Sequence, residues 1–351
     1  MRAAVFYGRG DIRVEDVAVR EPGPDEVRVR VAAVGVCGTD ASEFSAGPKM
    51  FPIEHTHPVS GHRGPMIPGH EFSGYVEAIG TNVTSLGLGD LVASGAVLPC
   101  GTCELCRTGR PNLCTRTATV GLHRDGALAE TVVLPARGLV RAGPYGVTAD
   151  AAALAQPMAI AVHAMRRGSP AKGSSAIVIG CGGIGAFLVF ALAREDVRVT
   201  AVDVSQARLA IAARLGASAT IAAWEILAPA PLVFEVSGTQ AGLDAAVAAV
   251  ATAGRVVSVG IAKGAATYDA RRVTLNEIEI VGSNALDVRT DVTRALELLA
   301  LDHGVWSLVA PRAVPLSEAV DKGIGALSEG RASAIKVLID PSIARERETV
   351  F

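Results

Sequence analysis

A glycine-rich turn between two uncharged apolar runs constrains the fold of this 351-residue chain more than any other feature. It reads GCGGIG, from Gly180 to Gly185, after the strand-like run SSAIVI and before the helical run AFLVFALA. In such a setting Gly180 permits a tight turn, Gly182 lets the backbone approach a pyrophosphate, and Gly185 lets helix and strand pack closely. Gly183 and Ile184 begin the helix, whose free N–H groups attract phosphate. The turn predicts a dinucleotide site, with an ordinary packing turn as the alternative.

The uncharged stretch Ser174–Ala193 is just long enough to span a bilayer. Its glycines, and its change from β-like to helical residues, favour a buried strand–turn–helix instead. The N-terminus carries charges where a signal peptide would need an apolar stretch, and 33 Lys+Arg against 35 Asp+Glu leave a net charge of −2. We therefore expect a soluble, cytoplasmic protein without nucleic-acid or membrane partners.

Strand-like and helical runs alternate after residue 150, which predicts a doubly wound parallel sheet with helices on both faces. The expected strands are Ser175–Gly180, Val197–Val202, Pro231–Val236 and Arg255–Val259, and the expected helices are Ile184–Arg194, Gln206–Leu215 and Gln240–Ala251. A chain of this length usually forms two domains.

The first 140 residues contain short strand-like runs punctuated by Gly and Pro. We expect strands at Arg28–Val34, Phe72–Ile79 and Leu91–Val97. After about residue 288 a helical run, Asp291–Leu301, leads to strand-like Lys336–Ile339. This tail is too small to fold alone, so we expect it to return to the N-terminal β domain.

Asp203 ends the next strand-like run, 18 residues beyond Gly185. A carboxylate at this place accepts hydrogen bonds from ribose hydroxyls and repels a 2′-phosphate. We therefore expect NAD rather than NADP, with a helix-capping role for Asp203 as the alternative. Cys181, inside the turn, has no metal partner nearby in the sequence and is expected to fill space.

Four cysteines within fifteen residues form the most specific motif of the chain, namely Cys100, Cys103, Cys106 and Cys114. Four clustered thiolates can close a tetrahedral zinc site, which is structural because no position is left for substrate. A redox CxxC pair and a nucleic-acid zinc ribbon are the alternatives. The first needs only two cysteines, and the second has two CxxC pairs separated by a longer loop.

Two upstream segments, VCGTD at 36–40 and PGHE at 68–71, supply Cys37, Thr39, His70 and Glu71. One Cys, one His and one Glu are plausible ligands for a zinc ion that keeps an open position. Taken alone, such a trio can equally be a core cysteine and a surface His-Glu pair.

In their order along the chain, these motifs resemble those of the zinc-dependent medium-chain dehydrogenase/reductase superfamily, including the alcohol dehydrogenases. The segments EFSAGP, HPVSG and GHEFSG at 43–48, 57–61 and 69–74 resemble its butanediol dehydrogenase branch, related to sorbitol, threonine and aminocyclitol dehydrogenases. The resemblance implies an α/β architecture. A GroES-like β-rich catalytic domain at 1–150, with a structural zinc lobe at about 95–116, would be completed by 289–351. A Rossmann domain would occupy 151–288.

The resemblance also implies roles for particular residues. Cys37, His70 and Glu71 would hold the catalytic zinc or lie just around it, and Thr39 would take the substrate proton. Further matches are Asp203 and Arg208 at the ribose and Val259, Gly260 and Ile261 under the nicotinamide. Two zinc ions per chain, NAD(H), a small-molecule substrate and a homodimer or homotetramer are expected.

Two positions depart from the pattern of that branch. Ser42 stands where its members commonly have a relay histidine, and Gln156 stands where they commonly have a glutamate facing the zinc. His55 or His57 could replace the relay, and a neutral Gln156 reduces the charge at the site. His163 is expected to be a packed structural residue.

We expect an NAD-dependent zinc enzyme that oxidises a secondary alcohol (a vicinal diol, polyol or aminocyclitol) to the ketone. One alternative is a reductase of an activated C=C or C=N bond whose catalytic zinc is weak or absent. Another is a protein that senses nucleotide or binds nucleic acid without turnover, which has no need for the set of Cys37, Thr39, His70 and Glu71.

Overall fold

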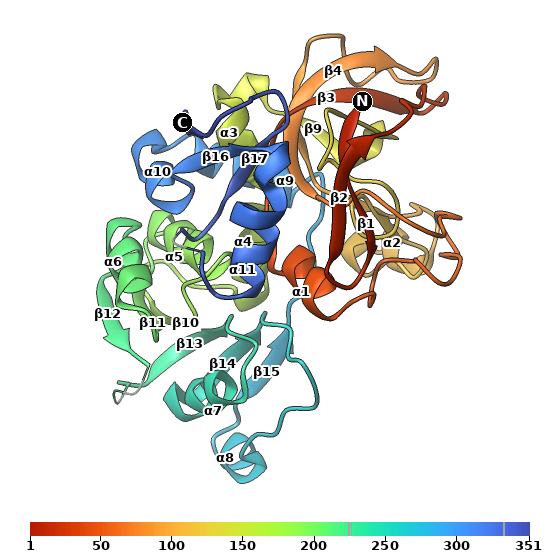
Figure 1. Cartoon of the computed structure of the whole chain (residues 1–351). Coiled ribbons are helices and arrows are strands. Elements are labelled where there is room, and N and C mark those ends of the chain that lie inside the picture. Colours follow the sequence, from red (N-terminus) through yellow and green to blue (C-terminus); the bar gives the residue numbers. More distant parts are fainter. Residues whose placement is uncertain (224, 226, 333) are drawn as a thin grey trace. The chain divides into compact units, whose positions relative to one another are not determined.

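The computed structural model describes residues 1–223, 225, 227–332 and 334–351 (Figure 1). The chain forms two compact units. The first contains Met1–Ala159 and Leu286–Phe351, and the second contains Ile160–Ala285. Helix α4, Ala155–Gly168, crosses the division between them.

A six-stranded parallel sheet forms the centre of the second unit, in the order β12-β11-β10-β13-β14-β15. The strands are β10 Ser175–Ile179, β11 Arg198–Asp203, β12 Ala219–Ala222, β13 Ala230–Glu235, β14 Val250–Ser258 and β15 Glu279–Gly282. The chain starts in the middle, moves to one edge and then to the other, which confirms the doubly wound expectation. Strands β12 and β15 are only four residues long and largely exposed, so the apolar runs did not reveal them.

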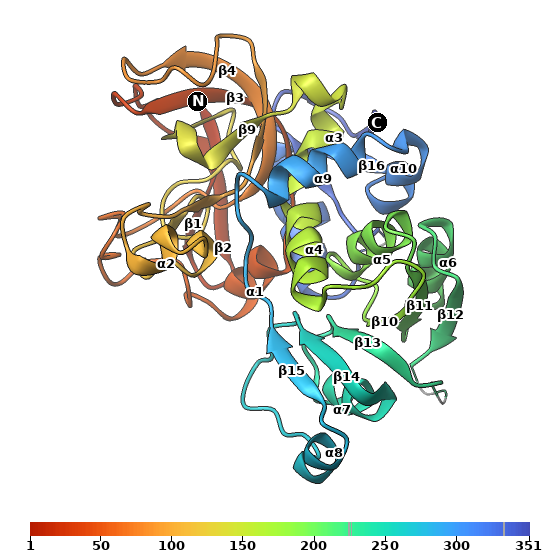
Figure 2. The same ribbon diagram turned by 180° about the vertical axis from the view of Figure 1, so that it is seen from behind.

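Helices cover this sheet because their apolar residues match its buried side chains. Helix α5, Gly185–Arg194, packs on β10 and β11; α6, Gln206–Arg214, packs on β11 and β12; and α7, Gln240–Ala249, packs on β13 and β14 (Figures 1 and 2). The last helix of the unit is α8, Ala270–Leu275. Ile177, Val233 and Val256, one on each of three neighbouring strands, are almost fully buried in one core cluster.

The first unit is built on an eight-stranded sheet in the order β18-β16-β17-β3-β4-β5-β9, with β8 also paired to β3. Its strands are β3 Glu26–Gly35, β4 Glu71–Ile79, β5 Leu91–Ser94, β8 Thr131–Pro135, β9 Leu139–Arg141, β16 Arg312–Pro315, β17 Leu338–Asp340 and β18 Arg347–Glu348. Strand β17 pairs antiparallel with β3, so the C-terminal tail returns to the N-terminal sheet as expected.

Smaller elements complete the first unit. Two hairpins pair β1 Arg2–Gly8 with β2 Asp11–Asp16 and β6 Val97–Leu98 with β7 Ala118–Thr119. The α-helices are α1 Gly38–Ala46, α2 Glu104–Arg107, α3 Ala149–Ala153, α9 Asp291–Leu299, α10 Trp306–Val309 and α11 Gly325–Ser328. The core gathers alternate residues of β3, including Val27, Val29 and Val31, against Phe72 of β4.

Several expected elements differ from the structure in their bounds, among them α9, which ends at Leu299, and β17, which begins at Leu338. The strand expected at Leu91–Val97 is broken after Ser94, because Gly95 lies against Val288 and Ala96 has φ of 60°. The helix expected to reach Ala251 ends at Ala249, where β14 begins. In the part of the chain that the structure describes, no helix has the length and apolar character needed to cross a membrane.

Candidate catalytic and metal sites

Cys37, His70 and Glu71 come together because β3 and β4 are paired at their ends. Gly35 lies opposite Glu71 in the register, Cys37 comes two residues after the end of β3, and His70 directly precedes β4. One ligand atom from each residue lies within 4.8 Å of the others. A Cβ at Gly35 would lie 2.5 Å from Oε2 of Glu71, so the carboxylate would have to move from its present place.

Asp40 borders this trio from the first turn of α1. It is buried, its Oδ2 accepts a hydrogen bond of 3.0 Å from the Cys37 amide, and its Oδ1 lies 3.7 Å from Nδ1 of His70. Burial lowers the pKa of His70, but the negative charges of Asp40 and the Cys37 thiolate outweigh it and hold that pKa above its ordinary value. The pocket is thus strongly favourable to positive charge.

Lys336 is a site residue that the sequence motifs did not identify. Its buried Nζ lies 2.6 Å from both carboxylate oxygens of Glu71 and 3.3 Å from the carbonyl oxygen of Val36. Burial lowers the pKa of Lys336, and the charge of Glu71 outweighs it and raises that pKa. Glu71 is therefore held in an ion pair beside Cys37 and His70. The sequence did contain one signal for Lys336, since it is an ionisable residue at the start of the otherwise apolar run KVLI at 336–339.

Buried polar atoms without partners test whether these residues fit a bound group. Among the described residues such atoms include Oδ1 of Asp40, Nδ1 of His70 and Oε1 of Gln156. Buried polar groups are normally satisfied, so orphaned atoms point to something that binds there. A thiolate, an imidazole and nearby carboxylate and amide oxygens form a donor set that suits zinc with an open position.

The remaining residues singled out around this site have defined surroundings. Oγ1 of Thr39, on the first turn of α1, lies 3.8 Å from Sγ of Cys37. Ser42 accepts a 3.0 Å hydrogen bond from Nζ of Lys49. His57 stacks on His123 with ring centroids 4.4 Å apart, and its Nδ1 accepts from the Ser60 amide. The structure does not bring His57 into the cluster with Cys37.

The four-cysteine cluster forms a compact lobe around α2. The Sγ atoms of Cys100, Cys103, Cys106 and Cys114 lie within 4.8 Å of one another, and all four thiols are free. Backbone amides of Thr102 and Cys103 donate to Sγ of Cys100, and these bonds contribute to lowering its pKa to about 5. Amide donors stabilise thiolates, so the lobe is arranged to hold a metal ion.

The glycine turn of the second unit behaves as its sequence suggests. Gly180 has φ of 95°, and a Cβ at Gly185 would collide with the Gly180 carbonyl oxygen. At Gly182, by contrast, a Cβ would meet only the tip of Arg208 at 3.9 Å. The fold itself therefore needs Gly180 and Gly185, whereas a Cβ would fit at Gly182.

Asp203 is buried at the end of β11 and holds the turn in place. Its Oδ2 accepts a 2.7 Å hydrogen bond from the Cys181 amide and its Oδ1 accepts a 2.8 Å bond from the Ser205 amide. Nη1 of Arg208 lies 3.8 Å from Oδ2. Ser205, and not Asp203, caps helix α6, because the Ser205 side chain accepts a hydrogen bond from the Arg208 amide.

The segment after β14 approaches the same edge of the sheet. Gly260 packs against Gly238, and Ile261 is 88% exposed. Glu235, which the sequence analysis did not single out, is buried and accepts from the amides of Ser237 and Gly238. It fixes the backbone at the carboxyl end of β13, next to the glycine turn.

Comparisons with known proteins agree with this geometry. The family model of the alcohol dehydrogenase GroES-like domain matches residues 23–144, and that of the zinc-binding dehydrogenase matches residues 183–300. D-altritol 5-dehydrogenase of Agrobacterium fabrum is 31% identical over 91% of this chain and 94% of its own. The crystal structure of 2R,3R-butanediol dehydrogenase from Bacillus subtilis superposes with a TM-score of 0.88 at 26% identity, covering 97% and 99% of the two chains.

An Escherichia coli alcohol dehydrogenase solved with NADH superposes with a TM-score of 0.84 at 25% identity, covering 97% of this chain and 99% of its own. The chain belongs to the zinc-dependent medium-chain alcohol dehydrogenase family. It is an oxidoreductase of small molecules that uses zinc and a nicotinamide dinucleotide. The family resemblance and the fold class expected from the sequence are both confirmed.

Proposed function

We propose that this protein oxidises a secondary alcohol, in a vicinal diol, polyol or aminocyclitol, to the ketone and transfers the hydride to NAD. The observation that carries the proposal is the cluster of half-buried Cys37 with buried His70 and Glu71, beside unpartnered atoms on Asp40 and His70. Relatives named for altritol and butanediol support this substrate class.

In this proposal Cys37 and His70 would hold the catalytic zinc, with Glu71 and Gln156 beside it. A zinc ion held there would lower the pKa of the substrate hydroxyl toward neutral pH. Thr39, whose Oγ1 lies 3.8 Å from Sγ of Cys37, would take the hydroxyl proton while passing its own proton on toward solvent. The carbon bearing that hydroxyl would become the ketone carbon, and its hydride would go to the nicotinamide of NAD, the oxidant.

The second unit binds the dinucleotide in this proposal. Its phosphates would lie on the turn formed by Gly180, Gly182, Gly183, Ile184 and Gly185, and the nicotinamide would lie against Val259, Gly260 and Ile261. Asp203 would accept hydrogen bonds from the adenosine ribose, with Arg208 beside it. The buried carboxylate of Asp203 favours NAD because it repels a 2′-phosphate.

Residues 1–150 with 289–351 are proposed as the catalytic domain and residues 151–288 as the dinucleotide-binding domain. A structural zinc held by Cys100, Cys103, Cys106 and Cys114 would stabilise the lobe at about 95–116. We also propose a cytoplasmic location, since six free cysteines suit a reducing compartment.

A homodimer or homotetramer is proposed as the assembly. Strand β15 ends the six-stranded sheet, and its outer edge has no strand beside it among the described residues. Exposed apolar side chains lie on and near it, including Leu275, Tyr268 and Ile280. An exposed sheet edge with apolar neighbours is a natural surface for pairing with a second copy.

Zinc content and substrate turnover test the proposed function. Protein purified with zinc and without chelators should contain two zinc ions per chain and should reduce NAD in the presence of diols or polyols. One zinc per chain, together with NADH-dependent reduction of enones or imines and no alcohol oxidation, would replace the proposal with the reductase alternative.

A further inference from the structure

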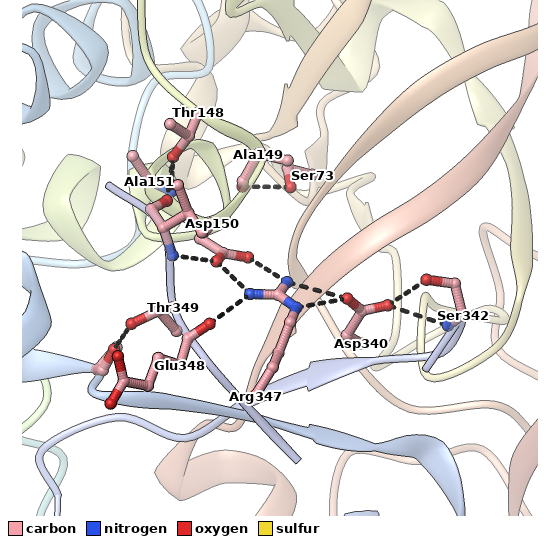
Figure 3. Close-up of polar contacts among 12 residues, drawn as sticks. Ser73, Thr148, Ala149, Asp150, Ala151, Asp340, Ser342, Arg347, Glu348 and Thr349 are labelled. Atoms are coloured by element: carbon pink, nitrogen blue, oxygen red, sulfur yellow. Dashed lines mark hydrogen bonds and ion pairs between the residues drawn. The ribbon is translucent and has the colours of Figure 1, made fainter. Parts of the chain in front are cut away.

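The C-terminal tail is tied to helix α3 by the polar network drawn in Figure 3. Arg347 of β18 donates from Nη1 to Oδ2 of Asp150 at 2.7 Å and from Nη2 to Oδ1 at 2.8 Å. Asp150 is only 3% exposed. A two-point guanidinium–carboxylate contact fixes orientation as well as distance, so α3 cannot rotate against the tail without breaking it.

Arg347 is itself held from the other side. Its Nε and Nη2 lie 3.0 and 2.9 Å from Oδ2 of Asp340 at the end of β17, and the amide and hydroxyl of Ser342 donate to Oδ1 of Asp340. Figure 3 shows the guanidinium between the two carboxylates. The hydrogen bond from Arg347 to Asp150 contributes most to raising the pKa of Arg347, so the arginine stays charged.

We call Asp150, Asp340 and Arg347, with the hydrogen bonds among them, the clamp. Backbone groups of the tail add further bonds to it. The Val350 amide donates to Oδ2 of Asp150 at 2.7 Å, and the hydroxyl of Thr148 donates to the Val350 carbonyl oxygen at 2.6 Å. Thr148 also caps α3, since its side chain accepts from the Ala151 amide. The N-terminus of α3 is therefore surrounded by bonds to the tail.

Helix α3 connects the clamp to the candidate catalytic centre. Its five residues are separated by Leu154 alone from α4, whose second residue is Gln156. Ser73, two residues after Glu71 on β4, donates to the carbonyl oxygen of Ala149 at 2.6 Å. The same C-terminal segment supplies Lys336, which binds Glu71. The tail thus contacts both the strand with Glu71 and the helix that leads to Gln156.

We propose that Arg347 is a positioning residue for Gln156. The clamp fixes α3, and α3 fixes the buried amide of Gln156, whose Oε1 has no partner within the described residues. A neutral amide oxygen is a weaker ligand for zinc than a carboxylate, and groups around a ligand orient it. The inference rests on the proposed function only in giving Gln156 a place at the reacting centre.

A double-mutant cycle separates positioning from general stabilisation. The four proteins are wild type, Arg347→Gln, Gln156→Ala and the double variant. If Arg347 acts through Gln156, Arg347→Gln should lower kcat about 10–100-fold in the wild-type background, with KM for NAD unchanged, and less than twofold in the Gln156→Ala background. If the clamp only stabilises the unit, the two losses multiply and the proposal is overturned.

Two further measurements are independent of turnover. Amide exchange at residues 151–158 should accelerate in Arg347→Gln, and release of the more weakly held zinc to a chelator should show the same non-additivity as kcat. Unchanged exchange at 151–158 would overturn the proposal. If wild type oxidised no secondary alcohol but the exchange and zinc effects remained, the proposed function would fail and the clamp would stand.

Arg312→Gln is the matched control. Arg312 lies on β16 beside the same tail and pairs with Glu346 at 3.0 Å, but its side chain is 62% exposed and it does not contact Asp150. We expect wild-type kcat and exchange at 151–158 in this variant. A loss equal to that of Arg347→Gln would mean that any tail ion pair has the effect, and would overturn the assignment to Arg347.

Discussion

Individual side chains set the electrostatics of the candidate catalytic centre. Glu71 and Lys336 are both buried and neutralise each other across 2.6 Å. Removing one partner of a buried pair leaves an uncompensated charge and costs about 3–5 kcal/mol. Cys37 and His70 lie beside this pair, so charge changes at Glu71 or Lys336 affect folding, whereas changes at Cys37 affect chemistry first.

Cys37→Ser should abolish alcohol oxidation and leave the fold intact, because Cys37 is only half-buried. Partners one layer further out already change activity about 10–100-fold, so we expect kcat/KM to fall by more than about a hundredfold. Zinc content should drop from two ions per chain to one while the chain stays folded. Wild-type turnover in this variant would rule out Cys37 as a ligand.

Glu26 should contribute to stability at acidic pH. Burial raises the pKa of its carboxyl, but hydrogen bonds from Arg20, Arg124 and the Gly23 amide outweigh burial and lower the pKa to about 2. The unfolded chain therefore binds the proton first, and stability falls as pH decreases from about 4.5 to about 2. In Glu26→Gln the free energy of unfolding, measured by urea unfolding at a series of pH values, should fall less steeply over this range.

Glu21→Gln is the control for this experiment, because Glu21 pairs with Arg28 while its side chain is 80% exposed. It should follow the wild-type pH curve. If Glu26→Gln also followed the wild-type curve between about pH 4.5 and about pH 2, the ion pairs of Glu26 would not contribute to the loss of stability in acid.

Short elements carry the two binding motifs, and glycines within one element differ in what they do. Gly185 allows α5 to approach β10, whereas Gly182 leaves open space. In the zinc lobe, helix α2 begins directly after Cys103, and a short turn at Pro111–Leu113 ends directly before Cys114. Such a lobe has few apolar residues, so metal binding replaces a hydrophobic core.

Gly182→Ala and Gly185→Ala should separate binding from folding within the glycine turn. Gly182→Ala should keep the wild-type Tm but raise the Kd for NADH about tenfold, which equals about 1.4 kcal/mol. Gly185→Ala should lower Tm, because its Cβ would collide with the Gly180 carbonyl oxygen. Equal Tm values for both variants would contradict this division of roles.

Cys103→Ser should remove the structural zinc and unfold the lobe locally, since a structural zinc contributes directly to folding free energy. We expect one zinc fewer per chain and faster amide exchange at residues 100–114, with exchange in β10 and β11 unchanged. If the variant melts and exchanges like wild type, the four cysteines are not a structural site.

At the level of the whole molecule, the first unit is formed by two separate segments of the chain, and the second unit is formed by the segment between them. Residues 286–351 return to the sheet of the first unit, where β17 pairs with β3. The second unit, Ile160–Ala285, is continuous in sequence and contains all the residues proposed to bind the dinucleotide. Cofactor binding and metal binding should therefore stabilise different parts of the molecule.

NAD at about a hundred times its Kd should add about 2.7 kcal/mol to the free energy of unfolding of the part that binds it. Asp203→Ala should reduce this gain in stability. It should also narrow the difference in affinity between NAD and NADP, because the carboxylate that repels a 2′-phosphate is lost. Thermal melts with each dinucleotide measure both effects. An unaltered preference for NAD would remove the ribose role of Asp203.

Motifs in which the important residues are near neighbours could be predicted from the sequence. The zinc lobe, the glycine turn and the strand–helix alternation all depend on spacings of a few residues, and the structure contains them. Lys336 and Arg347 could not be predicted, because their partners Glu71 and Asp150 are 265 and 197 residues away. The roles assigned to Cys37, Thr39 and Gln156 stay predictions.

Local spacing by itself predicted the parallel sheet, the clustered thiols and the glycine turn, since each depends on residues that are near neighbours in the chain, and the order of these motifs carried the resemblance to the family. Only the tertiary structure decided that Glu71 is paired with a lysine and that the last residues of the chain hold α3. The physical reason is register: Leu338 lies opposite Gly35, and Gly35 lies opposite Glu71. Which residues meet across a sheet depends on the pairing of distant strands, and that pairing exists only in the folded chain.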